Sequence, residues 1–252
     1  MRVASVGLGL VGGSLARALT ARGHAVVGVD RAAAVRRRAL AVGAVSRSVA
    51  TAEEAADGAD VLVLAAPPAA NLALLGRLAG LSRSGLVVTD VGSVKTPIAR
   101  TARRLRLTRF VGGHPIAGNE GSGFAASSAA LFRGHAWVLT PAVDARATRQ
   151  VRRLVKAVGA RPVGMEAPAH DRALAFLSHV PQLASWALFE AAKADPVAGP
   201  ALALAGTGFR DMTRLARSPR PLWREILGQN RAEVSRALLA LQRALARSRR
   251  DL

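Results

Sequence analysis

The sequence predicts an α/β fold, namely a doubly wound parallel sheet followed by an all-α C-terminal domain. Strand-like apolar runs alternate with helical stretches through the first two thirds of the chain, and a glycine-rich turn joins the first run to the first helix. After Met165 no further strand-like run appears. We therefore expect a sheet domain over residues 1–165 and a helical domain over residues 166–252.

The predicted strands are apolar along their whole length, which is typical of parallel strands buried on both faces. They cover residues 3–6, 25–29, 61–65, 86–89, 110–111, 136–139 and 161–164. Helical stretches lie at residues 11–22, 32–42, 69–78, 94–105 and 145–158. This alternation predicts one parallel sheet with helices on both faces, and the strand at 161–164 closes the domain.

Three helices are expected in the second domain, at residues 167–194, 197–216 and 221–248. The last of them carries Val234, Leu238, Leu241 and Leu245 on one face. Because such apolar faces have to be covered, we expect these helices to pack on each other, on the sheet domain or on a second subunit.

The composition excludes several classes of protein and site. The 252 residues include no cysteine, which excludes disulfides, thiolate catalysis and cysteine-ligated metals, and we expect no metal site. The net charge is +20, but the arginines are scattered and lack the interleaved aromatic residues of nucleic-acid modules. We therefore expect no nucleic-acid partner, and we expect the positive field to attract anionic substrates.

The sequence also argues against a membrane protein. No low-charge apolar run reaches the ~18 residues that span a bilayer. The N-terminus begins directly as a strand, without the charged, apolar and cleavage regions of a signal peptide. We expect a cytoplasmic protein that has no membrane partner.

A glycine fingerprint of the form G-x-G-x-x-G lies between the first predicted strand and the first predicted helix. In this pattern Gly7 permits a tight turn, Gly9 lets the backbone approach a pyrophosphate, and Gly12 lets the helix pack closely on the strand. The amides around Leu10 and Val11 then open the helix and can bind the phosphates. The pattern predicts a Rossmann-like dinucleotide-binding domain.

An acidic residue follows the second predicted strand. Asp30 stands 18 residues after Gly12, close to the spacing of about 20 expected for a carboxylate that binds the ribose hydroxyls. Such a carboxylate repels a 2′-phosphate and therefore favours NAD, although the adjacent Arg31 leaves NADP possible. The structural alternative is that Asp30 caps a helix starting at Ala32.

The third predicted strand ends at two prolines, which cannot continue a central strand. Ala66 and Pro67 therefore leave the sheet at its carboxyl edge, where cofactors bind in such sheets. Small residues at this point would let the nicotinamide ribose approach. The alternative is a plain loop.

Two further segments carry reactive side chains at the same edge of the sheet. The first, DVGSVK at residues 90–95, holds the Ser93 hydroxyl and the Lys95 amine. The second, GGHPIAGNEG at residues 112–121, holds the His114 imidazole and the Glu120 carboxylate. Both segments follow predicted strands, so we expect them to face the cofactor crevice.

These two segments and several later ones resemble the prephenate/arogenate dehydrogenase family of tyrosine biosynthesis. The later segments are HD at residues 170–171, SHVP at 178–181, GFRDMTR at 208–214 and PLW at 221–223. The resemblance covers nearly the whole chain in order, and HPxAG, SHxP and GFRDxTR are far more specific than a glycine fingerprint. It implies a homodimer formed through a helical domain that also binds the substrate.

The family resemblance implies an NAD-dependent oxidative decarboxylation of prephenate or arogenate. A base takes the ring-hydroxyl proton, hydride moves from the same carbon to NAD, and carbon dioxide leaves as the ring becomes aromatic. His114 matches the family's catalytic histidine, and an imidazole suits a base at neutral pH. Ser93 matches a serine that hydrogen-bonds this histidine or the substrate hydroxyl, although it could instead cap a helix starting at Val94.

The resemblance also assigns the residues that bind the substrate. Arg214 matches the arginine that binds a substrate carboxylate, and Arg210 and Arg217 could share its helix face. The remaining residues expected at the substrate are His179, Gln182, Trp223 and Glu120. Structural alternatives are core packing for Trp223 and a solvated loop carboxylate for Glu120.

One departure from the family leaves the substrate open between prephenate and arogenate. The family usually has a second histidine where Gln182 stands, and an amide cannot carry charge. His170 and Lys95 receive no role from the sequence. Two rival functions remain: another NAD(P) dehydrogenase of this architecture that acts on a small anionic substrate, and a nucleotide-binding protein without catalysis.

Overall fold

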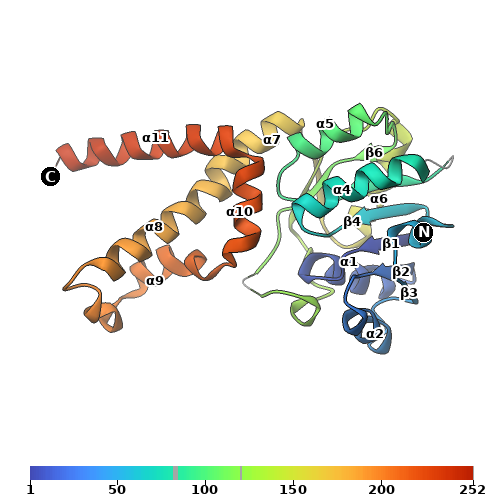
Figure 1. Cartoon of the computed structure of the whole chain (residues 1–252), viewed down its shortest axis with the longest axis horizontal. Helices are drawn as coiled ribbons and strands as arrows, with labels where there is room; N and C mark the ends of the chain where they lie inside the picture. The colour runs from blue at the N-terminus through green and yellow to red at the C-terminus, as the bar shows by residue number, and fades with distance from the viewer. Residues whose placement is uncertain (82–84, 120, 252) are drawn as a thin grey trace. The chain divides into compact units, whose positions relative to one another are not determined.

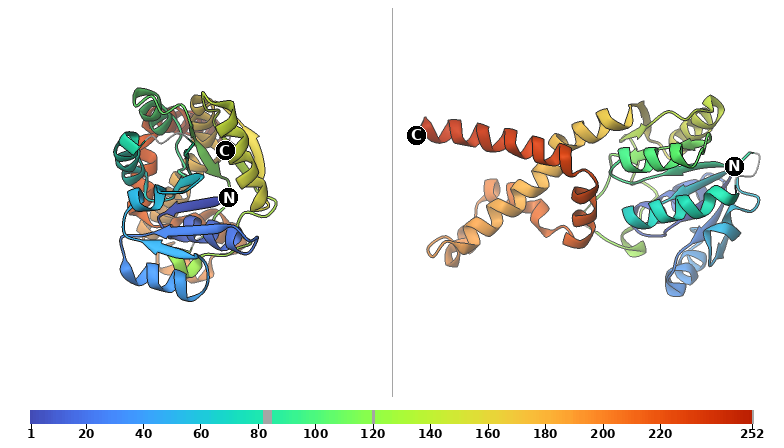
Figure 2. Two further views of the ribbon diagram at one scale, coloured as in Figure 1. Left: turned by 90° about the vertical axis from the view of Figure 1, so that its right-hand side faces the viewer. Right: turned by 45° about the horizontal axis from the view of Figure 1, so that its top comes forward.

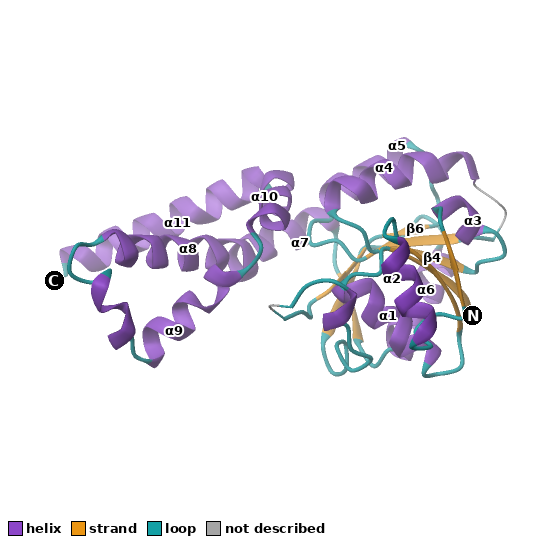
Figure 3. Ribbon diagram, turned by 60° about the horizontal axis from the view of Figure 1, so that its bottom comes forward, coloured by secondary structure: helices purple, strands orange, loops and turns teal. Residues whose placement is uncertain are grey.

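The computed structural model of the chain describes residues 1–81, 85–119 and 121–251. The chain divides into two compact units, Met1–His170 and Asp171–Leu252 (Figure 1). Strands occur in the first of these units, and the second consists of helices and loops (Figure 3). The fold class predicted from the sequence is confirmed.

A six-stranded parallel sheet forms the centre of the first unit, in the order β3-β2-β1-β4-β5-β6. Its strands are β1 (Arg2–Val6), β2 (Ala25–Val29), β3 (Arg47–Val49), β4 (Val61–Leu64), β5 (Val87–Asp90) and β6 (Phe110–Val111). The order reverses at β1, because β2 and β3 lie on one side of it and β4 to β6 on the other. Such a reversal is the switch point at which ligands bind in open α/β sheets.

Helices cover both faces of this sheet, which explains why its strands are apolar throughout. In β4, Val61 and Val63 face one core, while Leu62 and Leu64 face the other. The first core is covered by α1 (Leu10–Thr20), α2 (Ala33–Ala41) and α6 (Ala145–Ala157). The second is covered by α3 (Ala52–Ala56), α4 (Pro68–Leu78) and α5 (Thr96–Arg104), as Figures 1 and 2 show for several of these helices.

A separate three-stranded sheet corrects the predicted position of the last two strands. Here β7 (Gly113–Pro115) pairs antiparallel with β8 (Ala136–Leu139), which pairs parallel with β9 (Arg161–Gly164). The chain leaves the main sheet at Gly112, where a Cβ atom would lie 2.4 Å from Thr140 Oγ1. The sequence prediction missed β3, α3 and β7, because elements of three to five residues are too short to show a period.

The second unit is built from helices that are more broken than the sequence suggested. The helix α7 (Ala167–Leu174) crosses the boundary between the units, passes through a π turn (Ala175–His179) and continues as α8 (Val180–Ala194). The register shift just before Pro181 has a clear cause, because proline has no backbone N–H to donate to the preceding turn.

Two of the three expected helices are interrupted, which corrects the prediction. In place of one helix over 197–216, the chain forms a 3-10 segment (Pro200–Leu204), α9 (Thr207–Thr213) and a 3-10 turn (Arg214–Arg217). In place of one helix over 221–248, it forms α10 (Arg220–Gln229) and α11 (Arg231–Arg250), which meet at the buried Asn230. Arg210 therefore lies on α9, and Arg214 begins the 3-10 turn that directly follows this helix.

The core of the second unit is small, and many of its large apolar side chains are exposed. The buried cluster consists of Ala175, Val180, Val234 and Ala237. Large apolar side chains that remain exposed are Phe176, Leu177, Leu188, Val197, Leu204, Met212, Leu222, Leu239 and Leu245. Figures 1 and 2 show α8 and α11 separating toward their far ends, so this unit does not cover its own apolar faces.

Over the part of the chain that the structure describes, no helix combines the length and the apolar character needed to cross a membrane.

The packing of α1 on the sheet gives a test of the fold. A Cβ atom on Gly12 would lie 1.9 Å from the Gly7 carbonyl oxygen, so Gly12→Ala must displace the helix from the strand. We expect a loss of about 1–3 kcal/mol in the free energy of unfolding, measured by urea denaturation. Gly9→Ala is the matched control, because a Cβ there would meet nothing within 4 Å, and its midpoint should stay near that of the wild type. Equal midpoints for Gly12→Ala and the wild type would contradict the packing.

Candidate functional site

The glycine turn lies between the ends of two strands that flank β1. Gly7 has a φ of +98°, a conformation that favours glycine, and its N–H donates to the Val29 carbonyl over 2.7 Å. A Cβ on Gly7 would come within 2.6 Å of the Ala65 carbonyl oxygen. The turn after β1 therefore fits between the ends of β2 and β4 because this residue has no side chain.

The start of α1 has the features of an anion-binding site. Gly9 is the N-cap residue and α1 begins at Leu10, so the amides of Leu10, Val11 and Gly12 lie in the first helical turn. Amides of a first turn have no acceptor within their own helix and carry the positive end of its dipole. Since a Cβ on Gly9 would meet no protein atom within 4 Å, the space beside it is open to a phosphate.

Asp30 connects the glycine turn to the start of α2. Its Oδ2 accepts a hydrogen bond from Leu8 N over 3.0 Å, and its Oδ1 accepts one from Ala32 N over 2.9 Å. A carboxylate has about four acceptor positions, so the half-buried Asp30 can still accept hydrogen bonds from ribose hydroxyls. The capping alternative is wrong, because α2 begins at Ala33 with Ala32 as its N-cap and has no side-chain cap hydrogen bond. Asp30 instead fixes the backbone just before this helix, which is compatible with a cofactor role.

The turn after β4 is fixed by a residue that the sequence did not single out. Asn71 is buried, its Oδ1 accepts from Ala66 N over 3.1 Å, and its Nδ2 donates to the Leu64 carbonyl over 3.4 Å. Pro67 precedes α4, and Pro68 occupies the first turn of that helix. Ala66 and Pro67 thus form a bend between β4 and α4 at the carboxyl edge of the sheet, and Asn71 holds it in place.

A buried carboxylate connects the two segments that carry Ser93 and His114. Asp90, at the end of β5, accepts a hydrogen bond from Gly113 N over 3.0 Å through Oδ1 and one from Gly92 N over 2.9 Å through Oδ2. Its Oδ2 also pairs with the ammonium of Lys95, and both side chains are almost completely buried. Lys95 therefore neutralises the carboxylate that binds the residue next to His114.

Ser93 lies half-buried in the loop between β5 and α5. The sequence allowed a helix-cap role for it, with a helix starting at Val94. That alternative is wrong, because α5 begins at Thr96 and Lys95 occupies its N-cap position. Ser93 therefore does not cap α5.

His114 lies half-buried on β7 and contacts a second histidine. Its Nδ1 is 2.9 Å from Nε2 of His170, and the two rings meet edge to face with centroids 5.1 Å apart. His170 is completely buried at the end of the first unit. The sequence gave no role to His170, and no local pattern could have paired two residues that are 56 positions apart.

Glu120 lies outside the residues that the structure describes. The loop that follows it is anchored on α1. Ser128 N donates to Ser14 Oγ over 2.9 Å, Arg17 Nε donates to Ser127 Oγ over 2.8 Å, and Arg17 also stacks on the ring of Phe124. The segment after His114 therefore contacts the helix that begins at the glycine turn.

The second unit brings together His179, Gln182 and Trp223, which the sequence assigned to the substrate, with the further residue Trp186. The ring of Trp223 lies edge to face with His179 and with Trp186, at centroid distances of 6.1 and 6.3 Å. Gln182 is buried, and its Nε2 donates to the Leu215 carbonyl over 2.6 Å. Trp186 Nε1 donates to the carbonyl of Ala216, the residue after Leu215, over 3.2 Å. Gln182 and Trp186 thus bind the turn that begins with the exposed Arg214.

The protonation of His179 follows from its neighbour Asn230. Asn230 Nδ2 donates to the Asp171 carbonyl over 2.7 Å, which fixes the orientation of the amide because the reversed amide would place two oxygens together. The same Nδ2 lies 3.1 Å from His179 Nδ1, so Nδ1 must accept. A neutral His179 therefore carries its hydrogen on Nε2 and presents a donor there.

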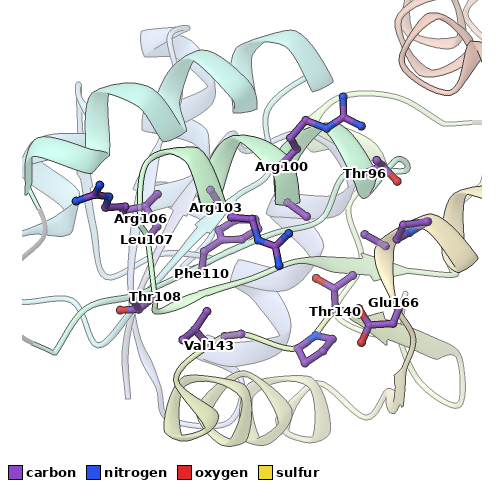
Figure 4. A pocket seen from close by; sticks show the side chains of 16 residues that line it. Thr96, Arg100, Arg103, Arg106, Leu107, Thr108, Phe110, Thr140, Val143 and Glu166 are labelled. Atoms are coloured by element: carbon purple, nitrogen blue, oxygen red, sulfur yellow. The ribbon is translucent and has the colours of Figure 1, made fainter.

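A cavity of about 480 Å³ lies apart from these residues in the first unit. Figure 4 shows the guanidinium of Arg103 extending over it, with Thr140 and Glu166 on the opposite side. The lining includes none of the residues predicted for the cofactor or the substrate. In a chain with 36 basic residues, arginines beside a surface cavity are expected from composition and do not identify a site.

Comparisons with known proteins agree with the resemblance in the sequence. The family model for the nucleotide-binding domain of prephenate dehydrogenase matches residues 15–163, and the model for its dimerization domain matches residues 166–250. The chain is 33% identical over 237 residues to the prephenate dehydrogenase of Bacillus subtilis (strain 168), which covers 90% of this chain and 64% of that protein. The chain thus spans slightly less than two thirds of the length of that relative.

Two solved structures are similar over almost the whole chain. The arogenate dehydrogenase of Synechocystis has a TM-score of 0.85 at 30% identity, covering 98% of this chain and 90% of that one. A prephenate dehydrogenase from A. aeolicus, in complex with hydroxyphenyl propionate and NAD+, has a TM-score of 0.90 at 29% identity, covering 98% of this chain and 88% of that one.

The buried pair of Asp90 and Lys95 gives a second stability test. Lys95→Met would leave the carboxylate buried without its cation, and we expect a loss of about 3–5 kcal/mol in the free energy of unfolding. The double variant Lys95→Met with Asp90→Asn removes both charges and should recover part of that loss. Urea denaturation of the two variants measures the difference, and a single variant as stable as the wild type would contradict the role of Lys95.

Proposed function

This chain belongs to the prephenate dehydrogenase family, and on that premise we propose that it catalyses the NAD-dependent oxidative decarboxylation of prephenate, arogenate or both. The products would be 4-hydroxyphenylpyruvate from prephenate and tyrosine from arogenate. The observation that carries the proposal is the hydrogen bond that Gly113 N donates to Asp90 Oδ1, which joins the Ser93 loop to the His114 strand. Both lie at the edge of the sheet where the glycine turn and Asp30 are found.

The first unit would bind the dinucleotide. The amides at the start of α1 bind the pyrophosphate, Gly9 allows its close approach, and Asp30 accepts hydrogen bonds from the ribose hydroxyls. The carboxylate of Asp30 favours NAD over NADP because it repels a 2′-phosphate. NAD supplies the hydride acceptor of the reaction when it is bound.

His114 would act as the base. Its Nδ1 is bonded to His170, and we assign the uptake of the ring-hydroxyl proton to its Nε2. Ser93 lies in the adjoining loop, where its hydroxyl can bind either the imidazole or the substrate hydroxyl. Removal of this proton raises electron density on the ring carbon that loses hydride, and loss of carbon dioxide then makes the ring aromatic.

The second unit would bind the anionic part of the substrate. Arg214 is assigned to a carboxylate, because a guanidinium gives a bidentate and orienting contact. His179 presents a donor at Nε2, and Trp223 forms an apolar wall beside it. Gln182 and Glu120 are assigned to the substrate as well. The nucleotide-binding domain would end at residue 165.

We also propose a cytoplasmic homodimer formed through the second unit. The dimerization-domain model matches this unit, and its exposed apolar residues on α8 and α11, such as Leu188, Leu239 and Leu245, support this assembly. Burying such side chains in a second copy would remove apolar area from water, which is the main driving force for permanent dimers.

Supplying prephenate and arogenate separately, with NAD or NADP, tests the activity. We expect reduced-cofactor absorbance to rise with NAD and with at least one of the two substrates. Binding of NAD without turnover of either substrate would favour a nucleotide-binding protein that lacks catalysis. Turnover of another small anionic hydroxy acid alone would favour the rival dehydrogenase.

The base assignment predicts a selective loss of turnover. His114→Asn removes the proton acceptor and should lower kcat by about 10²–10⁴-fold, since that is the usual contribution of a general base. The affinity for NAD, measured by calorimetry, should change little. His24→Asn is the matched control because His24 lies on the loop before β2. Wild-type turnover in His114→Asn would contradict the assignment.

The assignment of Arg214 to a substrate carboxylate predicts a change in KM, whereas the assignment of His114 predicts a change in kcat. Arg214→Ala should mainly raise KM for the substrate, by about 10–150-fold if about 1.5–3 kcal/mol of charge-assisted binding is lost. Arg210→Ala removes the same charge four residues away and should leave KM near its wild-type value. If both variants raise KM equally, the effect belongs to the general positive field and not to Arg214.

A further inference from the structure

We propose that His170 is a positioning residue that holds His114 in the one tautomer able to accept a proton at Nε2. The inference rests on the proposed role of His114 as the base, and it gives a function to His170, which lies in the HD segment but received no role from the sequence. His170 acts through His114, by way of the contact between His114 Nδ1 and His170 Nε2.

The distance between the two imidazoles shows that they share one hydrogen bond. The 2.9 Å separation of the two nitrogens is a hydrogen bond, and a hydrogen bond between two neutral imidazoles contains a single hydrogen. Either His114 donates from Nδ1, which leaves its Nε2 without hydrogen, or His170 donates, which places the hydrogen of His114 on Nε2.

The chemistry of a base selects between these two arrangements. If His170 donates, both nitrogens of His114 are occupied, one by its own hydrogen and the other by the bond that it accepts. If His114 donates, Nε2 has a lone pair that can take the substrate proton, and the bond to His170 persists afterwards. Only the second arrangement lets His114 gain a proton without breaking the pair. A base oriented by a third group is the general logic of such sites.

The fold explains why His170 can hold a fixed position. His114 lies on β7, which pairs with β8, which pairs with β9, and α7 with His170 begins shortly after β9 ends. His170 N donates to the Glu166 carbonyl over 2.9 Å at the start of α7, and the side chain is completely buried. The small second sheet therefore sets the separation of the two imidazoles.

The direct test is the tautomer of His114, read from the ¹⁵N shifts of its two ring nitrogens by NMR. The chain has five histidines, so single substitutions can assign the signals. We expect neutral His114 to carry its hydrogen on Nδ1, the less common form in free histidine. A wild-type spectrum with the hydrogen of His114 on Nε2 would overturn the proposal without any variant.

Two variants then separate positioning from packing. His170→Phe keeps an aromatic ring in the buried site but removes the acceptor nitrogen, so His114 should shift to the Nε2–H form. His170→Gln places an amide oxygen near the position of Nε2, so it should keep the Nδ1–H form. His135→Phe, which changes an exposed histidine, should change neither the tautomer of His114 nor the turnover.

Turnover gives the second readout. We expect kcat of His170→Phe to fall on the order of 10²-fold, near the lower end of a general-base contribution, with NAD affinity unchanged. His170→Gln should restore most of the rate. A folded His170→Phe protein with wild-type kcat and an unchanged His114 tautomer would overturn the proposal. If the wild type turned over neither substrate while the tautomer behaved as expected, the proposed function would fail and the positioning role would stand.

Discussion

The buried carboxylate of Asp90 is the constraint on which the first unit's site depends. It ends β5, and it binds the amide next to His114, the turn that carries Ser93, and the ammonium of Lys95. Placing two charges in a protein interior costs several kcal/mol, and the cost is offset only when the geometry and the remaining hydrogen bonds are good. Here the carboxylate has backbone partners on both oxygens, so the pair joins two loops that the main sheet alone would leave separate.

The same principle applies to the two histidines proposed for the site. His114 is bonded at Nδ1 by His170, and His179 is bonded at Nδ1 by Asn230. The Asn230 amide sets the tautomer of His179, and under our proposal His170 sets that of His114, with Nε2 as the functional atom in both. The consequences differ, because His114 needs a bare Nε2 to accept a proton, whereas His179 presents a hydrogen there. Under this proposal, one residue type supplies a proton acceptor in the first unit and a hydrogen-bond donor in the second.

The sequence predicted those parts of the structure whose signals are local. Continuous apolar strands, the glycine turn from Gly7 to Gly12 and the carboxylate of Asp30 each depend on residues close in sequence. The short strand β7 and the break at Asn230 depend on tertiary contacts, because β7 exists by pairing with β8 and Asn230 by binding residues about 50–60 positions away. His170 and Asp90 stood within recognised segments, yet their roles are visible only as contacts.

Gln182 stands where the family usually has a histidine, and this difference changes both charge and hydrogen bonding. An imidazole at this position could carry charge, whereas the amide of Gln182 donates from Nε2 to the carbonyl of Leu215. That carbonyl belongs to the turn that begins with Arg214, and Trp186 binds the next carbonyl of the same turn. Under the proposed function, Gln182 would affect the substrate in two ways, through the charge that it lacks and through the backbone of the turn that begins with Arg214. In that proposal, a preference between prephenate and arogenate would depend on this turn as well as on direct contact, because a shift in the turn would change how Arg214 meets the carboxylate.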